Sequence, residues 1–393
     1  MSATEVRVAV VDPQAYTLPY DDELCRALGA AGAEVELLTA HFTHGTPPVP
    51  EGYTRREIFG PPLAGLLERR PTTPARVPLK FGGHAVGLAR LLRRVRSWQA
   101  DVVHWQWAPL PWLDLRALRA AGRSAGATVF TAHDVLPRRS RDAAPLWAEL
   151  YGSCDRVIVH GAASRDRLLV EVGGIAPERI AVIPHGILHA AAPGTLPPEQ
   201  EEPRILFFGL IRPDKGLDVL IEALPAVAAR VPGVRLDVIG SPRMPIEPLR
   251  ARAQVLGVAQ RIDWDLRFVP DSEVSDVFAH ARVIALPYRW IEGSGILATA
   301  LARGVPPVVT AAGTFPELCA EYDLGDPVPP GDPAALAVGL VRMLTDAGAR
   351  ARAMAGMERA RSELAWERAA QLTLELYERV LAGKLRAPPP AGD

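Results

Sequence analysis

The stretch ILFFGLIRPDKGLDVLIEAL, residues 205–224, decides the fold of this chain. Its first residues are apolar and end at Gly209, as a buried strand does, and its last residues carry leucine and isoleucine at the spacing of one helical face. Arg212, Lys215 and Gly216 lie between the two. Strand, short turn and helix in this order form half of a β-α-β unit of a parallel sheet. Ligands of such sheets bind beyond the carboxyl ends of the strands, so we expect chemistry in this turn.

The same alternation extends through the whole chain. Apolar, β-branched runs typical of strands occur at residues 6–11, 35–39, 101–104, 128–131, 156–159, 179–183, 204–208, 234–239, 261–264, 283–286 and 305–309. Helical patterns separate most of these runs, for example at residues 21–31 and 113–122. The pattern predicts an α/β protein with two Rossmann-like, doubly wound parallel-sheet domains.

Breaks in this pattern predict the domain boundaries. Residues 190–203 are rich in proline and small residues and show no periodicity, which is typical of a linker. We therefore expect one domain over residues 1–189 and a second over residues 204–365. Residues 366–386 carry a helical apolar stripe and are expected to form a closing helix that packs back on the N-terminal domain.

Composition excludes several classes of protein. The chain has 393 residues, with 44 Lys and Arg against 45 Asp and Glu, so no chain-wide field attracts nucleic acid. Its three cysteines contain no CxxC pair, which excludes a disulfide framework and a structural zinc site. The N-terminus lacks the pattern of a signal peptide, and no apolar run approaches the ~20 residues that span a bilayer. We expect a cytoplasmic protein, with peripheral contact at the inner face of the cell membrane as the alternative.

Two strand-to-helix turns carry the groups that suit a diphosphate. Arg212 and Lys215 precede a helix N-terminus, which favours anions. After the strand at residues 283–286, Glu292-Gly293-Ser294-Gly295 open another helix, whose small residues and first amides can approach phosphate or sugar oxygens. The alternatives are a surface turn with two solvated cations and, for Glu292, a solvated carboxylate at a helix start.

These segments resemble the signature of retaining GT-B glycosyltransferases of family 4 (group 1), which is Gly-Arg-x-x-x-x-Lys-Gly followed by Glu-Gly-Phe-Gly-Leu. Lys215 and Gly216 keep the spacing from Gly209, whereas Arg212 follows Gly209 by three residues instead of one. The resemblance implies a GT-B fold, with two domains facing each other across a cleft. It implies catalytic roles for His133, Arg212, Lys215 and Glu292. It implies donor contacts for Gly209, Gly240, Arg267, Phe268, Gly293, Ser294, Gly295 and Ile296. Ala300 departs from the family, which usually has a ribose-binding Glu there.

The N-terminal domain is expected to bind the acceptor. His133 and Asp134 directly follow the strand at residues 128–131, and in the family a His at this place faces the donor sugar. The expected acceptor-side residues are Tyr20, Asp21, His104, Trp105 and Asp134. A core position is the alternative for His133, and two tryptophans in an interdomain core are the alternative for the HWQW segment.

The resemblance implies a hexosyltransferase that moves a sugar from a UDP- or GDP-linked donor to an unidentified hydroxyl acceptor, with retention, and with no metal and no further cofactor. The sequence contains no GxGxxG after a strand, no GxxxxGK[ST] and no HExxH, which argues against a dehydrogenase, a P-loop NTPase and a metalloprotease. The pairs His41/His44 and His185/His189 are interpreted as structural. A nucleotide-sugar 2-epimerase on the same fold and a non-catalytic nucleotide-sugar-binding protein are the alternative functions.

Residues 55–98 form a basic segment with ten Arg and Lys against two Glu. Leucines, a valine and a tryptophan share one helical face with arginines beside it. Such a helix can lie on anionic lipid, which makes this segment the candidate for peripheral membrane contact. We favour the ordinary interpretation, a helix packed on its sheet with a solvated arginine face.

Overall fold

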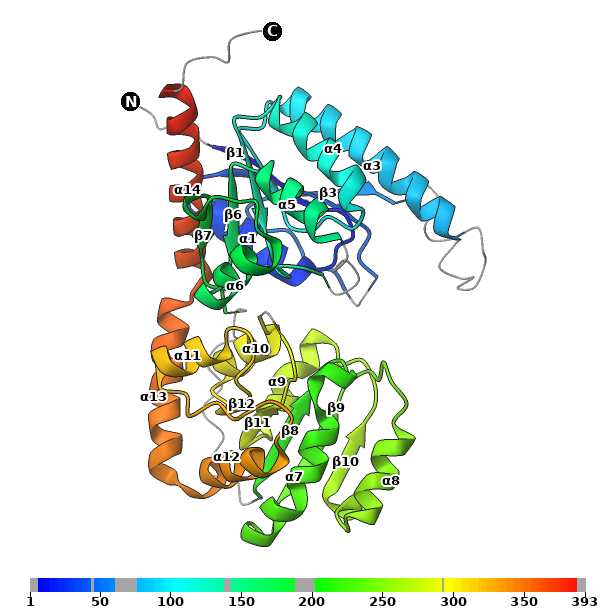
Figure 1. Cartoon of the computed structure of the whole chain (residues 1–393), viewed down its shortest axis with the longest axis vertical. Helices are drawn as coiled ribbons and strands as arrows, with labels where there is room; N and C mark the ends of the chain where they lie inside the picture. The colour runs from blue at the N-terminus through cyan, green and yellow to red at the C-terminus, as the bar shows by residue number, and fades with distance from the viewer. Residues whose placement is uncertain are drawn as a thin grey trace. The chain divides into compact units, whose positions relative to one another are not determined.

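The chain folds as two compact α/β units (Figure 1). The computed structural model describes residues 6–43, 46–60, 76–137, 143–187, 202–291 and 293–386. The first unit consists of Met1–Gly186 together with Trp366–Asp393, and the second of Ile187–Ala365. Most of the predicted linker, residues 190–201, lies outside the described residues. No described helix combines the length and the hydropathy required to cross a bilayer.

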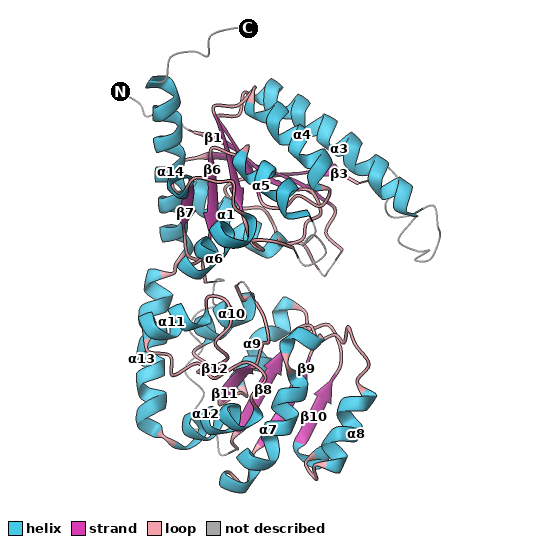
Figure 2. Ribbon diagram, viewed as in Figure 1, coloured by secondary structure: helices cyan, strands magenta, loops and turns pink. Residues whose placement is uncertain are grey.

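The first unit is built on a seven-stranded sheet in the order β3-β2-β1-β4-β5-β6-β7, and all of its strand pairs are parallel. The strands are β1 (Arg7–Asp12), β2 (Glu34–Ala40), β3 (Thr54–Phe59), β4 (Val102–Trp105), β5 (Ala127–Thr131), β6 (Arg156–Val159) and β7 (Ile180–Val182). The helices are α1 (Leu18–Ala30), α3 (Arg76–Trp98), α4 (Pro111–Gly122), α5 (Ala144–Gly152), α6 (Ala162–Arg167) and α14 (Trp366–Arg386). Figure 2 shows these helices around the strands of the sheet.

Alternation along β1 explains why both faces of this sheet are buried. Val8 and Val10 belong to the core shared with α1 and α14, and Ala9 and Val11 to the core shared with α3, α4 and α5. Successive side chains of a strand point to opposite faces, so a strand covered on both sides is apolar throughout. Helix α14 packs against α1 within this unit.

Helix α3 packs on its sheet as an ordinary core helix. Leu88, Leu91 and Val95 are buried, and Arg94 pairs with Glu36 of β2. The apolar stripe of this part of the helix is therefore not available to a lipid surface. This corrects the alternative that the stripe lies on anionic lipid. Residues 61–75 of the basic segment, and the side chains of residues 76–81, lie outside the description.

The second unit has a five-stranded parallel sheet in the order β10-β9-β8-β11-β12. The strands are β8 (Arg204–Phe208), β9 (Arg235–Ile239), β10 (Ile262–Asp265), β11 (Val283–Leu286) and β12 (Pro307–Val309). The helices are α7 (Leu217–Arg230), α8 (Glu247–Val255), α9 (Asp271–Ala279), α10 (Gly295–Arg303), α11 (Phe315–Tyr322), α12 (Pro333–Thr345) and α13 (Ala347–Glu363). Ile205 and Phe207 of β8 face the core of α7, α8 and α12, and Leu206 faces the core of α9, α10, α11 and α13. The central strand β8 thus delivers the turn at Gly209 to the carboxyl edge of the sheet.

Candidate functional site

The turns after β8 and β9 lie against each other. The Gly209 N–H donates to the Ile239 carbonyl (3.0 Å), and the Ile211 N–H donates to the Ser241 carbonyl (3.0 Å). Gly240 has a φ of +148°, and a Cβ added there would lie 1.8 Å from the Gly209 carbonyl oxygen. No side chain fits between these two turns, so backbone lines the carboxyl ends of β8 and β9.

Gly216 ties the turn after β8 to the segment after β11. It has a left-handed φ of +69°, and a Cβ added there would lie 1.9 Å from the carbonyl oxygen of Pro287. Both the conformation and the close contact require glycine. Lys215 therefore lies where the ends of β8 and β11 meet.

The two cations of this turn are held by neighbouring side chains. The Lys215 Nζ lies 3.7 Å from the centroid of the Tyr288 ring. Arg212 donates through a terminal guanidinium nitrogen to Asp214 Oδ2 (2.8 Å). Its Nε is buried and has no hydrogen-bond partner among the residues that the structure describes. The guanidinium thus keeps one buried donor that a ligand can use.

The start of α10 completes this edge. Ser294 is its N-cap, and its Oγ accepts a hydrogen bond from the Leu297 N–H (3.2 Å). The amides of Gly295 and Ile296 belong to the first turn, which has no intrahelical acceptors. The Ile296 side chain lies 3.3 Å from the position of a Cβ on Gly209, so the helix start adjoins the turn after β8. Glu292 lies outside the described residues.

Arg267 and Phe268 follow β10 and differ in how available their side chains are to a ligand. Arg267 forms ion pairs with Asp265 (2.9 Å) and Glu273 (2.6 Å), so its charge is balanced within the unit. The Phe268 side chain is 52% exposed, which leaves its ring free to stack on a planar ligand. Arg267 also lines an open groove of about 490 Å³ whose other walls include Asp237, Glu273 and His280.

In the first unit, a hydrogen-bonded row of side chains runs along the carboxyl ends of β4, β5, β6 and β7. His160 donates through Nδ1 to the Ile183 carbonyl (3.0 Å), and its Nε2 lies 3.3 Å from His133 Nδ1. His133 Nε2 lies 2.9 Å from the side-chain amide oxygen of Gln106. Burial, with smaller effects from His160 and other histidines, lowers the pKa of His133 well below its usual value. His133 is therefore neutral near pH 7, and both of its ring nitrogens are engaged within the unit.

Aromatic rings surround His133. Trp107 stacks on the His133 ring, with centroids 5.2 Å apart, and Tyr16 packs edge-on against Trp107 at 4.8 Å. Tyr16 is 66% exposed, and Trp107 is half-buried. Together Tyr16, Trp107 and His133 form a stacked aromatic cluster at the carboxyl edge of this sheet, and its exposed member, Tyr16, can contact the apolar face of a sugar or polyol.

Two family descriptions match the chain. Glycosyltransferase Family 4 matches residues 22–190, and Glycosyl transferases group 1 matches residues 202–346. The chain belongs to glycosyltransferase family 4 (group 1). A D-inositol 3-phosphate glycosyltransferase of Segniliparus rotundus is 27% identical to it, with 92% of this chain and 84% of that protein covered. A protein of the same name from Xylanimonas cellulosilytica is 28% identical, with 90% of this chain and 89% of that protein covered.

Solved structures show the same GT-B fold. Sucrose-phosphate synthase from Thermosynechococcus elongatus matches this glycosyltransferase with a TM-score of 0.72 and 19% identity, covering 96% of this chain and 100% of the other. Anabaena HepE, solved in complex with UDP, matches with a TM-score of 0.70 and 16% identity over 96% of this chain and 100% of the other. The predicted fold class and the predicted enzyme class are confirmed: the chain is a GT-B glycosyltransferase.

Several predicted acceptor-side residues of the glycosyltransferase lie in its core. Trp105 is 0% exposed and packs in the core beside α4 and α5, because β4 is a central strand covered on both faces. His104 is 1% exposed and bonds Tyr377 (2.6 Å) and Thr131 (2.7 Å). Neither side chain presents itself to an acceptor, which corrects that expectation. Trp107, two residues on, is the accessible tryptophan of this segment.

Tyr20 and Asp21 also lie inward, whereas Asp134 is only partly buried. The Tyr20 ring, 9% exposed, is edge-on to His133 at 4.6 Å and to Trp366 at 4.8 Å. Asp21 is 0% exposed and hydrogen-bonds the equally buried carboxyl group of Asp12. Asp134 is half-buried, with a buried Oδ1. Asp21 is therefore an internal carboxyl group and not a surface ligand for an acceptor.

Asp21→Asn should stabilise the glycosyltransferase at neutral and higher pH. Burial, reinforced by the Asp12 charge, raises the pKa of Asp21 well above its usual value. The folded chain then holds a proton that the unfolded chain releases, so stability falls as pH rises from the ordinary Asp range toward the raised pKa. An uncharged amide removes this loss, and we expect a gain of about 1–2 kcal/mol in the free energy of unfolding at pH 8.

Denaturant unfolding at pH 5 and pH 8 measures this effect. The gain should be larger at pH 8 than at pH 5. Asp166→Asn, at a carboxyl group that is 63% exposed, is the matched control and should change stability little at either pH. A less stable Asp21→Asn variant at both pH values would show that the carboxyl group itself is required.

Sequence reasoning missed Tyr288 and His160 at these sites and interpreted His185 only as structural. Tyr288 lies under Lys215, and His160 and His185 surround Tyr20 together with His133. Each directly follows the end of a strand, or lies within a few residues of it, so the strand-end rule that singled out His133 would have found them. His185, read as structural, lies in this ring cluster. No group of three or more metal-ligating side chains occurs among the described residues.

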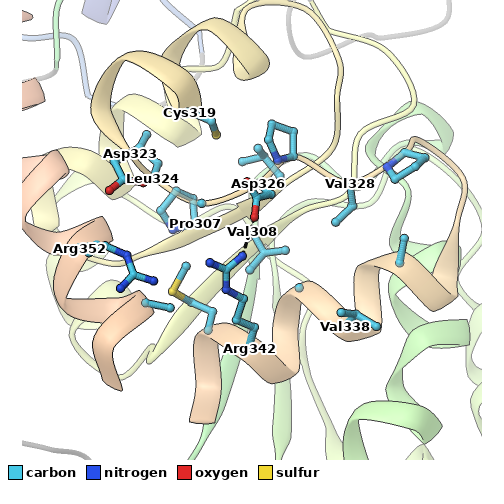
Figure 3. A pocket seen from close by; sticks show the side chains of 18 residues that line it. Pro307, Val308, Cys319, Asp323, Leu324, Asp326, Val328, Val338, Arg342 and Arg352 are labelled. Atoms are coloured by element: carbon cyan, nitrogen blue, oxygen red, sulfur yellow. Dashed lines mark hydrogen bonds and ion pairs between the residues drawn. The ribbon is translucent and has the colours of Figure 1, made fainter. Parts of the chain in front are cut away.

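A separate pocket lies beside the edge strand β12 (Figure 3). It measures about 320 Å³ and has mostly apolar walls, including Val308, Leu324 and Val338. Arg342 in its wall pairs with Asp326 (2.5 Å), and Arg352 and Asp323 add one charge of each sign. The pocket therefore carries balanced charge, and it shares no residue with the turn after β8.

Proposed function

We propose that this glycosyltransferase transfers a sugar from a UDP- or GDP-linked donor to a hydroxyl of a sugar or polyol acceptor. Transfer proceeds with retention and requires neither a metal nor another cofactor. The observation that carries the donor assignment is the convergence of Lys215, the unpaired Arg212 Nε and the first amides of α10 at one sheet edge. A diphosphate offers the oxygen acceptors and the negative charge that these groups match.

The reaction breaks the bond between the anomeric carbon and the diphosphate oxygen and forms one to the acceptor oxygen. Negative charge builds on the diphosphate as it leaves, and the acceptor proton passes to a diphosphate oxygen. Lys215, Arg212 and the helix amides are fixed before the reaction, and preorganised charges of this kind are usually the largest catalytic contribution. Glu292 is proposed to contact the donor sugar, as the family pattern implies.

Relatives and neighbours support the substrate classes. HepE was solved with UDP and with UDP-glucose, which favours a UDP-linked donor. The curated relatives are named for transfer to D-inositol 3-phosphate, which favours a cyclic polyol acceptor. The exposed Tyr16 ring of the aromatic cluster that it forms with Trp107 and His133 suits the apolar face of such a ring. Ala300 is fully buried in α10, so the ribose is held by other groups.

The function is tested by incubating the protein with UDP- and GDP-sugars and an acceptor panel that begins with inositol 3-phosphate. Mass spectrometry detects the glycosylated product, and proton NMR of the anomeric coupling gives its configuration. An α-linked product from an α-linked donor is expected. An inverted product contradicts retention, and conversion of donor without acceptor supports the epimerase instead.

Turnover should be unchanged by EDTA. Fixed cations and amides of the second unit supply the charge stabilisation that a divalent ion would otherwise provide. Initial rates before and after chelation measure this. Loss of activity that returns with added Mg²⁺ or Mn²⁺ contradicts it.

We propose that any contact of the described part of α3 with a membrane uses its charged face, because its apolar stripe from Leu88 to Val95 is buried. Among the described side chains of this helix, the exposed cations are Arg90, Arg93 and Arg96. Sedimentation with vesicles of anionic lipid, compared with neutral vesicles, tests this contact, and equal recovery in both contradicts it.

A further inference from the structure

Tyr288 lies in the second unit, two residues beyond the end of β11, with its ring beneath the Lys215 ammonium group. The Nζ lies 3.7 Å from the ring centroid, well inside the ~6 Å reach of a cation–π contact. Tyr288 is 1% exposed, so the ring offers this face in a desolvated setting where the attraction is strongest. The ring therefore fixes the height and direction of the Lys215 side chain.

The ring itself is held from several sides. The Tyr288 carbonyl accepts a hydrogen bond from Thr310 Oγ1 (2.6 Å), and the fully buried Phe315 ring lies 5.6 Å away. The next residue, Arg289, donates through its backbone N–H to the Asp214 carbonyl (2.8 Å). Arg289 also pairs with Asp218 at the start of α7 (2.5 Å). These contacts clamp the segment after β11 onto the turn that carries Lys215.

The Tyr288 hydroxyl is a second buried hydrogen-bond donor at this edge of the sheet. Its oxygen is buried without a hydrogen bond of ordinary geometry among the residues described, and its polar neighbour is the side chain of Ser294, the N-cap of α10. Burial raises the pKa of Tyr288 above its usual value, so the hydroxyl keeps its proton. Buried polar groups are nearly always hydrogen-bonded, and the Arg212 Nε and the Tyr288 hydroxyl, both beside Lys215 and the start of α10, indicate a ligand rich in acceptor oxygens.

We propose that Tyr288 is a further donor-binding residue, whose ring positions Lys215 and whose hydroxyl donates to a phosphate oxygen of the donor. The proposal rests on the donor site of the proposed function and extends it to a residue outside the family motif. Its two parts, the role of the ring and the role of the hydroxyl, predict different effects for two substitutions. Tyr288→Phe keeps the ring face and removes the hydroxyl, whereas Tyr288→Leu removes both.

Calorimetric titration with UDP and GDP, together with steady-state kinetics, separates the two parts. For Tyr288→Phe we expect about tenfold weaker binding of the nucleotide that the wild type binds, because a hydrogen bond to a charged acceptor is lost. Its kcat should stay within a few-fold of the wild type. For Tyr288→Leu we expect the same loss of binding and a further fall of about tenfold or more in kcat, because Lys215 loses its support.

Tyr322→Phe is the matched control. This tyrosine is also buried in the second unit, and its hydroxyl bonds Glu363 (3.2 Å) away from the turn after β8. It should leave nucleotide binding unchanged. Thermal unfolding identifies any misfolded variant, and Tyr288→Met, which fills the space without a ring, replaces Tyr288→Leu if that variant does not fold.

The outcomes distinguish this proposal from the proposed function. If the wild type binds neither UDP nor GDP, the donor site itself is refuted. If the wild type binds and Tyr288→Phe binds equally well, the hydroxyl is not a donor contact. If Tyr288→Leu, or Tyr288→Met in its place, turns over as fast as Tyr288→Phe, the ring does not position Lys215. Either of the last two results overturns that part of the proposal while the function stands.

Discussion

Replacing Lys215 with alanine should lower the turnover number at least a hundredfold and leave the fold intact. The Nζ lies over the Tyr288 ring at the edge where the diphosphate is proposed to bind. A fixed group that stabilises developing charge contributes about 2–4 kcal/mol to lowering the barrier, and each ~1.4 kcal/mol is a factor of ten in rate. Steady-state kinetics gives the rate, and thermal unfolding gives the fold.

Arg342→Ala is the control for this variant. It removes the same charge from the same unit, at a side chain whose ion pair with Asp326 lies in the pocket beside β12. Its turnover should match that of the wild type, since exposed ion pairs contribute little. Near-normal turnover of Lys215→Ala would show that Lys215 does not contribute to catalysis.

Gly216→Ala should cost both stability and activity. The residue has a φ of +69°, and its new Cβ would meet the Pro287 carbonyl oxygen at 1.9 Å. Left-handed backbone costs a non-glycine residue about 1–2 kcal/mol, and the overlap forces a backbone shift that adds about 1–3 kcal/mol more. Because the shift moves Lys215 relative to Tyr288, turnover should fall at least tenfold.

Gly257→Ala measures the cost of the left-handed backbone conformation by itself. Gly257 has nearly the same φ, +70°, but nothing lies within 4 Å of a Cβ added there. It should lose only about 1–2 kcal/mol and keep its activity. Denaturant unfolding and kinetics of both variants make the comparison. Equal losses in the two variants would mean that the contact with Pro287 does not matter.

The fold was largely predictable because buried central strands appear in the sequence as short apolar runs. The predicted strands at residues 204–208 and 283–286 coincide with β8 and β11, short apolar runs bounded by turns. Strand β3 was missed because it is an exposed edge with the polar sequence TRREIF, which looks like part of a basic segment. Helix α1 begins at Leu18 and not at residue 21, since proline is favoured in the first turn of a helix.

The candidate site was predictable only in part. The turn at Gly209 and the start of α10 follow strands directly, so their place at one sheet edge follows from topology. Which tryptophan of the HWQW segment faces outward depends on where β4 ends, and Trp105 is its last residue. Tyr288 reaches Lys215 through contacts between residues far apart in sequence, such as that of Gly216 with Pro287 and that of Asp214 with Arg289. Such contacts leave no periodic signal in a single sequence.

The proposed function depends most on where the donor diphosphate binds. A crystal structure of the protein with UDP, or with GDP if that nucleotide binds instead, locates it directly. Phosphate oxygens should lie within hydrogen-bond distance of Lys215 Nζ and of the Gly295 and Ile296 amides. A diphosphate bound in the groove beside Arg267 and His280, or in the pocket beside β12, with Lys215 untouched, would contradict it.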